Sequence, residues 1–315
     1  MTTFLIRRLI GLLAALLAAS IVTFVAVEIL PGDPARSILG IGAEPTAVAA
    51  LQHQLGLDQP VLIRYAHWVS GLVGGELGLS WTYRVPVADL LGPRLAVTIP
   101  LAVLAMLLTV VVGLGLGIVA ALRPGTAVDA GAMTLAHAGM ALPNFWLGLL
   151  LILLFSVHLQ WLPAGGFPGW DAGVVRAIGA LLLPATALAA VQAAILARVS
   201  RAALLDVAKD DFVRTARAKG LSQSGALLRH ALRNAFVPVT ALMGLQFSYL
   251  IAGAVIVENV FALPGLGRFV FQAIANRDLV VVESVVWLLA ALVIVVSFVA
   301  DVAARLLDPR LSESR

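Results

Sequence analysis

Residues 200–238 read SRAALLDVAKDDFVRTARAKGLSQSGALLRHALRNAFVP and form the longest polar run of an otherwise apolar sequence. This run holds both lysines of the chain, with five arginines and three aspartates, so it carries a net positive charge. Apolar runs flank it, Leu181–Ala197 before and Phe236–Val257 after. Because Lys and Arg resist translocation across a membrane, we expect this basic segment to lie in the cytoplasm.

The centre of the run, Asp210–Gly220, predicts a short capped helix. Asp210 can accept hydrogen bonds from the free N–H groups of the first turn, and Gly220 can end the helix in a left-handed conformation. Phe212, Val213 and Ala216 share one face, which we expect to be offered to a partner. On composition alone, a solvated loop or a helix lying on anionic lipid is the favoured interpretation.

The composition of the 315-residue chain is that of an integral membrane protein. It is 61% hydrophobic and 12% charged, whereas a soluble domain is about half apolar and about one quarter charged. The net charge of +4 fits positive loops on the inner side of a membrane and gives no reason to expect nucleic acid as a partner. The absence of cysteine excludes disulfides, thiolate metal sites and a cysteine nucleophile.

Six apolar runs are long enough to cross the hydrocarbon core, which takes about 20 residues. They are Leu9–Leu30, Leu95–Leu122, Ala132–His158, Ala180–Ala197, Phe236–Val257 and Val280–Ala300. The first run is longer than the core of a usual signal peptide, and no small-residue cleavage pattern follows it, so we interpret it as a retained span. With the arginines and lysines gathered on one side, the sequence predicts an all-α polytopic membrane protein with six transmembrane helices and both termini in the cytoplasm.

The polar segments divide this single transmembrane domain of residues 1–315. We expect residues 31–94 to form a small extracytoplasmic subdomain, because they are too polar to span and too long for a hairpin. Residues 95–315 are then a five-helix core whose cytoplasmic loop is 200–235. Gln160–Gly179 and Glu258–Asp278 are also predicted to be external, the latter as a turn-rich surface or re-entrant segment.

A few polar or small residues inside the spans are candidates for particular roles. His137, Asn144 and Gln246 are candidates to line a pathway, although a packing hydrogen bond explains His137 about as well and Gln246 better. We also expect Pro143-Asn144 to bend the third span. Three small residues of the second span, Gly113, Gly115 and Gly117, are expected to allow close helix packing rather than to bind a nucleotide, since no strand precedes them.

Several motifs resemble the permease subunits of ABC importers, and more narrowly the dipeptide/oligopeptide/nickel permease family. The run D-F-V-R-T-A-R-A-K-G-L-S at 211–222 and R-H-A-L-R-N-A-F-V-P-V at 229–239 resemble the cytoplasmic loop of this family. Leu-Pro-Gly-Asp-Pro at 30–34 and E-x-V-F-x-x-P-G-L-G at 258–267 resemble its outer segments. The general importer motif has Glu-Ala-Ala where this chain has Arg214-Thr215-Ala216, a departure that is typical of the peptide-permease subgroup.

The resemblance implies an ABC importer type I permease fold, a mechanism and a set of partners. The predicted helix becomes the coupling helix, which contacts an ATPase subunit. Its expected contact residues are Asp210, Asp211, Phe212, Val213, Arg214, Thr215, Ala216, Arg217, Lys219 and Gly220. The implied partners are a second homologous permease subunit in a heterodimer, two ABC ATPase subunits, an extracytoplasmic substrate-binding protein and the lipid bilayer. ATP and Mg would be bound by the ATPase subunits, with no cofactor in this chain.

The resemblance also implies a place in the bacterial cytoplasmic (inner) membrane and a substrate class. Di- or oligopeptides are the expected substrates, and relatives also carry nickel chelates, glutathione and sugars. Catalytic motifs are missing, since no Gly-Lys pair forms a P-loop and the five histidines show no metal-ligand spacing. We therefore expect a non-catalytic permease subunit. An ion-coupled secondary transporter and an intramembrane enzyme are the alternatives, and both lack the coupling sequence.

Overall fold

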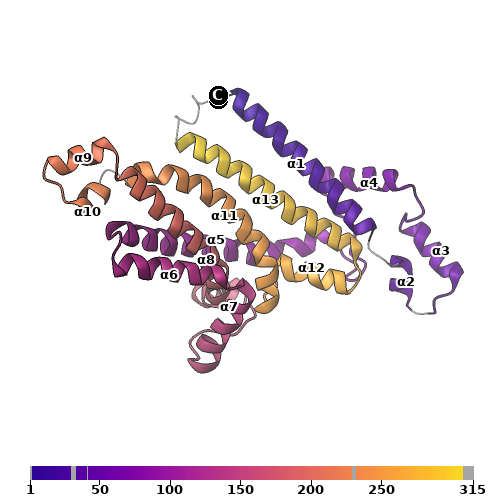
Figure 1. The fold of residues 1–315 in the computed structure, drawn as a ribbon. Coiled ribbons are helices and arrows are strands. Elements are labelled where there is room, and N and C mark those ends of the chain that lie inside the picture. The colour runs from indigo at the N-terminus through magenta and orange to yellow at the C-terminus, as the bar shows by residue number, and fades with distance from the viewer. Residues whose placement is uncertain (1, 30–32, 41, 229–231, 308–315) are drawn as a thin grey trace. The chain divides into compact units, whose positions relative to one another are not determined.

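The computed structural model describes the chain except for residues 1, 30–32, 41, 229–231 and 308–315. Parts of two resemblance motifs, at 30–32 and 229–231, therefore lie outside the described residues, as does the extreme C-terminus. Apart from one antiparallel bridge between Leu79 and Pro86, the regular structure of the described ranges is helical (Figure 1). The helices are α1 (Thr2–Glu28), α2 (Pro34–Leu39), α3 (Pro45–Gln54), α4 (Val61–Gly74), α5 (Val87–Leu122), α6 (Ala127–Ala141), α7 (Asn144–Leu151), α8 (Val174–Val207), α9 (Asp211–Ala218), α10 (Gln223–Ala226), α11 (Leu232–Val260), α12 (Leu266–Ala275) and α13 (Leu279–Leu307).

Within the described residues, five helices are long and apolar enough to cross a membrane: α1, α5, α8, α11 and α13. A sixth crossing is possible if α6 and α7, with the π-helix Ile152–His158 that extends α7, count as one span. This pair is bent by 105°. The expected bend is confirmed, and it is sharper than a kink. Pro143 lacks an N–H group and disfavours helix at Leu142, which is extended with ψ 126°.

Several helices extend beyond the apolar runs from which the spans were predicted. α5 begins at Val87, so the predicted boundary between residues 94 and 95 falls inside a helix. α8 begins at Val174, inside the predicted external loop, and continues to Val207, inside the predicted cytoplasmic loop. An apolar run shows which residues can lie in lipid, whereas the ends of a helix are set by its capping and turn residues.

The chain divides into two compact units, and the first holds residues 1–97 and 264–294. Its core is formed by one face each of α5, α12 and α13, with buried side chains that include Leu91, Phe269 and Val285. Asp278 is buried ahead of α13, where its carboxylate accepts hydrogen bonds from Ser80 Oγ (2.5 Å) and from the N–H of Thr82 (3.0 Å). This carboxylate therefore fastens the 79–86 turn to the start of α13.

The segment Glu258–Asp278, predicted to be a turn-rich surface or re-entrant segment, is more regular than expected. Glu258 lies in the last turn of α11, fully buried, and accepts a hydrogen bond from Thr98 Oγ1 at 2.6 Å. Half of the remainder is α12, a regular amphipathic helix with one buried face. The P-G-L-G turn signal was real, since Gly265 caps α12, but it marks a helix start and not a long loop.

The second unit holds residues 98–263 and 295–315, and α8 is its central helix. α8 packs against α6, α7 and α11 and buries a face rich in alanine and leucine. It also touches α5 at two glycines. A β-carbon built on Gly113 would lie 2.8 Å from the Ala193 carbonyl oxygen, and one on Gly117 would lie 2.7 Å from that of Ala197. Gly115 meets no atom within 4 Å, so the close-packing prediction is confirmed for the outer two glycines only.

We expect Gly117→Ala to destabilise the protein, because its methyl group would collide with the backbone of α8. Overpacking of this kind costs roughly 1–3 kcal/mol. Thermal unfolding of the detergent-purified chain measures the effect. Gly115→Ala is the matched control and should be neutral or slightly stabilising, since it only improves helix propensity. Equal loss of stability in both variants would show that these glycines do not set the α5–α8 distance.

Candidate functional site

The polar helix predicted from the sequence is α9, Asp211–Ala218, but its N-terminal cap differs from the prediction. Asp210 occupies the capping position with extended backbone, yet its carboxylate makes no capping hydrogen bond. The Asp210 carbonyl oxygen instead accepts from the N–H groups of Val213 (3.0 Å) and Arg214 (3.2 Å). The proposed side-chain cap is therefore wrong, and the residue starts the helix through its backbone alone.

The predicted glycine stop at the other end of α9 is confirmed. Gly220 has φ +95°, a conformation that residues with a β-carbon rarely adopt. Its N–H donates to the Arg217 carbonyl at 3.0 Å, and the Leu221 N–H reaches back to the Ala216 carbonyl at 3.3 Å. These two bonds form a Schellman motif, which ends the helix and sends the chain into α10.

The apolar side of α9 is used inside this chain. Val213 and Ala216 are buried and pack with the ends of α5 and α8 and with the α10 segment. Their buried neighbours are Ala121, Leu204, Ala226 and Leu227. The expectation that Val213 and Ala216 are offered to a partner is thus wrong, because a short amphipathic helix covers its apolar face with the nearest apolar surface of its own chain. Phe212 is different, since it remains 40% exposed.

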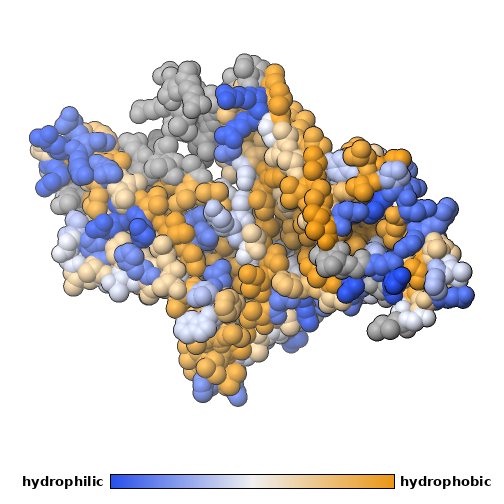
Figure 2. All heavy atoms as spheres, turned by 45° about the vertical axis from the view of Figure 1, so that its right-hand side comes forward, coloured by the Kyte–Doolittle hydropathy of each residue, from blue (hydrophilic) through white to orange (hydrophobic). Residues whose placement is uncertain are grey.

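The other side of α9 is polar and exposed. Asp210, Asp211, Arg214, Thr215, Arg217 and Lys219 are all exposed. Arg214 and Asp211 form an ion pair at 3.2 Å, but both side chains lie mostly in solvent, so the pair adds little stability. In Figure 2 hydrophilic residues gather around α9, whereas apolar side chains cover most of the long helices. α9 therefore presents charges and one aromatic ring on a firmly seated helix.

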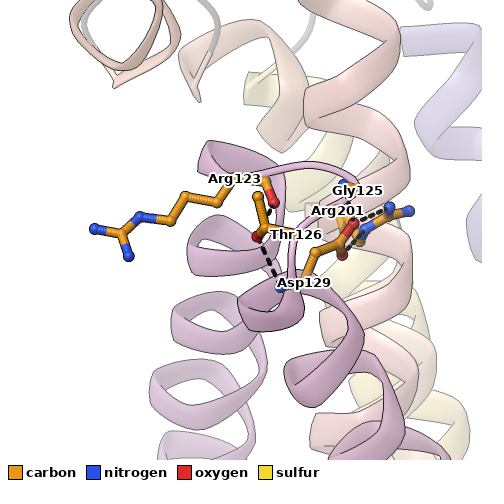
Figure 3. Close-up of polar contacts among 5 residues, drawn as sticks. All are labelled: Arg123, Gly125, Thr126, Asp129 and Arg201. Carbon is orange, nitrogen blue, oxygen red and sulfur yellow. Dashed lines mark hydrogen bonds and ion pairs between the residues drawn. The ribbon is translucent and has the colours of Figure 1, made fainter.

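An ion pair whose acid is buried joins α6 to α8, and no sequence motif indicates it. Asp129 on α6 accepts hydrogen bonds from Arg201 of α8 at both oxygens, from Nε at 2.6 Å and from Nη2 at 2.7 Å (Figure 3). The Gly125 N–H donates to the same carboxylate at 2.9 Å. Asp129 is only 5% exposed, so the pair is shielded from solvent on the acid's side. Arg123 points away from it (Figure 3).

This ion pair fastens a turn to the central helix. Thr126 caps α6, accepting from the Asp129 N–H at 3.5 Å, while its hydroxyl donates to the Arg123 carbonyl at 2.7 Å. The turn between α5 and α6 is thereby tied to α8 two turns before α8 ends. One feature of the sequence could have indicated a structural role for Asp129, because it is the only acidic residue between Asp89 and Asp171. Its partner, 72 residues away, could not be named without the fold.

The three pathway candidates lie in different settings. His137 is exposed on α6 and lines a hollow between α6 and α8. Asn144 begins α7, and its buried Oδ1 has no hydrogen-bond partner among the described residues. Gln246 is 1% exposed and donates to the Gln192 carbonyl at 2.8 Å, so it joins α11 to α8 as the packing alternative predicts.

Comparisons with known proteins place the chain. Residues 113–313 match the family described as binding-protein-dependent transport system inner membrane component, and residues 1–102 match the corresponding N-terminal family. The chain therefore belongs to the binding-protein-dependent transport system inner membrane components, and it is a multi-pass protein of the inner membrane.

Two curated relatives and one solved structure support this assignment. The chain is 41% identical over 310 residues to a peptide transport system permease protein of Brucella abortus (strain 2308), covering 98% of this chain and 99% of the relative. It is 40% identical over 309 residues to the glutathione transport system permease protein GsiC of Escherichia coli (strain K12), covering 98% of both. The inward-facing MetNI methionine ABC transporter has a chain with a similar fold, with a TM-score of 0.57, 18% identity, and coverage of 68% of this chain and 94% of that one. The predicted ABC-importer permease fold is thus confirmed.

We expect the Asp129–Arg201 pair to stabilise the second unit strongly. Arg201→Ala leaves the buried Asp129 carboxylate without its charged partner, and Asp129→Ala removes the acceptor that ties α6 to α8, so each should lower the unfolding temperature in detergent. The double variant should lose less than the sum of the two single losses. The same cycle on Lys209 and Asp206, an exposed pair at 3.0 Å, is the control and should show no coupling. Additive losses at Asp129 and Arg201 would contradict this role.

Proposed function

We propose that this chain is the non-catalytic permease subunit of an ATP-driven importer of peptides. The observation that carries the proposal is α9, a short polar helix that is firmly seated on its own chain and exposes an aromatic ring and charges outward. Membership of a binding-protein-dependent transport family supports a separate energy source, and the absence of a P-loop in the sequence agrees with it. Relatives named for peptides and for glutathione, itself a tripeptide, support the substrate class.

The proposed partners follow from the family. An extracytoplasmic binding protein would deliver the substrate, and two ATPase subunits would hold ATP and Mg. A second homologous permease subunit would pair with this chain as a heterodimer and enclose the pathway, to which His137 and Asn144 are candidates to contribute. Transport would follow from differential binding of ATP to the closed state of the ATPases, which moves both permeases between two conformations.

α9 is the proposed contact with an ATPase subunit. Phe212 would enter an apolar cleft of the partner, and the cations Arg214, Arg217 and Lys219 would meet acidic or carbonyl acceptors around it. Force applied to α9 passes through Val213 and Ala216 to the ends of α5 and α8. The coupling face is therefore the polar side of the helix, while the apolar side transmits the movement.

This assignment fixes the proposed topology. If α9 meets an ATPase it lies in the cytoplasm, with both termini on the same side and residues 31–94 outside. Single cysteines test this in a chain that has none. At the exposed positions Ser70 and Asn276, they should react with an impermeant reagent in intact cells. A cysteine at the exposed Arg217 should react only after permeabilisation. Labelling of position 217 from outside would refute the topology.

The proposed function is tested with Phe212→Ala in the complete transport complex. The parent complex should take up labelled tripeptides, glutathione included, in an ATP-dependent reaction, and should not need nickel. Losing an aromatic anchor at the centre of an interface should weaken ATPase attachment by at least about tenfold, measured by co-purification. The unfolding temperature should stay unchanged, because Phe212 is outside the buried cluster.

Trp161→Ala is the control for attachment, since Trp161 is an exposed aromatic residue of the external loop. It should retain the ATPase fully. Ala216→Asp is not a suitable test of the contact, because Ala216 is buried and a charge there would unseat α9 itself. Normal attachment and uptake in Phe212→Ala would mean that α9 is a solvated helix with no coupling role.

A further inference from the structure

The surface of the second unit has a hollow of about 590 Å³ between α6 and α8, and no role has yet been given to it. Its lining comes from these two helices only. The lining residues are Met133, His137 and Met140 of α6, with Ile195, Arg198, Val199, Arg201 and Ala202 of α8. The walls are thus mostly apolar, and the polar groups in them are two arginines and one histidine.

The charge in this hollow is positive and without a carboxylate. Arg201 is engaged by Asp129, which is not itself part of the lining. Arg198 forms no ion pair within the described ranges, and its Nη1 meets only the sulfur of Met140 at 3.5 Å, a weak acceptor. The Arg198 guanidinium therefore lies over an apolar wall, beside His137, and could still bind a charged acceptor.

The hollow lies well inside the two helices. His137 stands ten residues after Ala127, which places it about 15 Å along α6 from the turn, and Arg198 stands about 14 Å before the end of α8. Arg198 directly follows the apolar run Ala180–Ala197, at the inner end of its span, where a charged side chain faces water, a lipid headgroup or a protein partner. The surface that carries Arg198 and His137 is therefore suited to a solute pathway.

We propose that this hollow binds the carboxylate end of the transported peptide, with Arg198 as the principal contact. The inference rests on the proposed peptide import. A carboxylate is the acceptor that a guanidinium fork fits best, and a positive amino end would be repelled. Two flexible methionines beside Ile195 and Val199 form a wall that can adapt to side chains of different shape. The site would recognise the C-terminal carboxylate, which peptides of every sequence share.

The experiment compares two forms of one labelled peptide, tri-alanine with a free carboxylate and tri-alanine with a C-terminal amide. Uptake is measured in proteoliposomes that hold the complete complex with one preparation of binding protein. Comparing Arg198→Gln with the parent cancels any preference of the binding protein. We expect the variant to lower uptake of the free acid about tenfold, the loss of one charge-assisted contact, and to leave uptake of the amide unchanged.

Two further variants sharpen the test. Arg176→Gln changes an exposed arginine at the opposite end of the same helix and should alter neither rate. Arg198→Lys keeps the charge but loses the fork, so it should recover part of the free-acid uptake.

An acid-to-amide ratio in Arg198→Gln equal to that of the parent would overturn the proposal. This holds whether both rates are normal, as for an arginine that reaches lipid phosphates, or both fall together, as for one that pairs with the second subunit. Failure of the parent to take up either form would overturn the proposed function, and this inference with it.

Discussion

The ion pair between Asp129 and Arg201 is the interaction on which the arrangement of the second unit depends. The carboxylate of Asp129 is buried, and Arg201 binds both of its oxygens while the Gly125 N–H binds one of them. The pair fixes the position of α6 along the axis of α8. It also fixes the turn after α5, whose last residues form the seat of α9. The seat of α9 therefore depends in part on a charge pair between two other helices.

α9 shows how one short helix can serve two surfaces. Its residues Val213 and Ala216 are buried against the rest of the chain, and its exposed residues would meet a partner under the proposed function. Substitutions on the two sides therefore have different meanings. A change at a buried position alters the seat of α9 and the stability of the chain, whereas a change at the exposed Phe212 leaves that seat intact. The Schellman turn at Gly220 ends the helix at a defined residue.

Much of this architecture could be predicted from the sequence, and the failures share one cause. Long apolar runs identify spans because lipid requires them, and Gly220 identifies a helix end because few other residues adopt its backbone conformation. The length of α8, the burial of Ala216 and the partner of Asp129 depend instead on what lies opposite in three dimensions. Asp210 is a local example: its side chain is suited to capping α9, but in the structure only its carbonyl oxygen bonds to the helix.

The contact of Gly113 and Gly117 with α8 has a mechanical consequence. Side chains at most helix interfaces can hop between rotamers and so absorb a small displacement before it reaches the neighbouring helix. Here each glycine lies directly against a backbone carbonyl of α8, so little of the contact passes through rotatable groups. A small tilt of α8 has to be accompanied by the same tilt of α5, without slack or delay. Around Gly113 and Gly117 the two helices therefore behave as one stiff element, and bending of the second unit must be taken up elsewhere, such as at the break at Pro143.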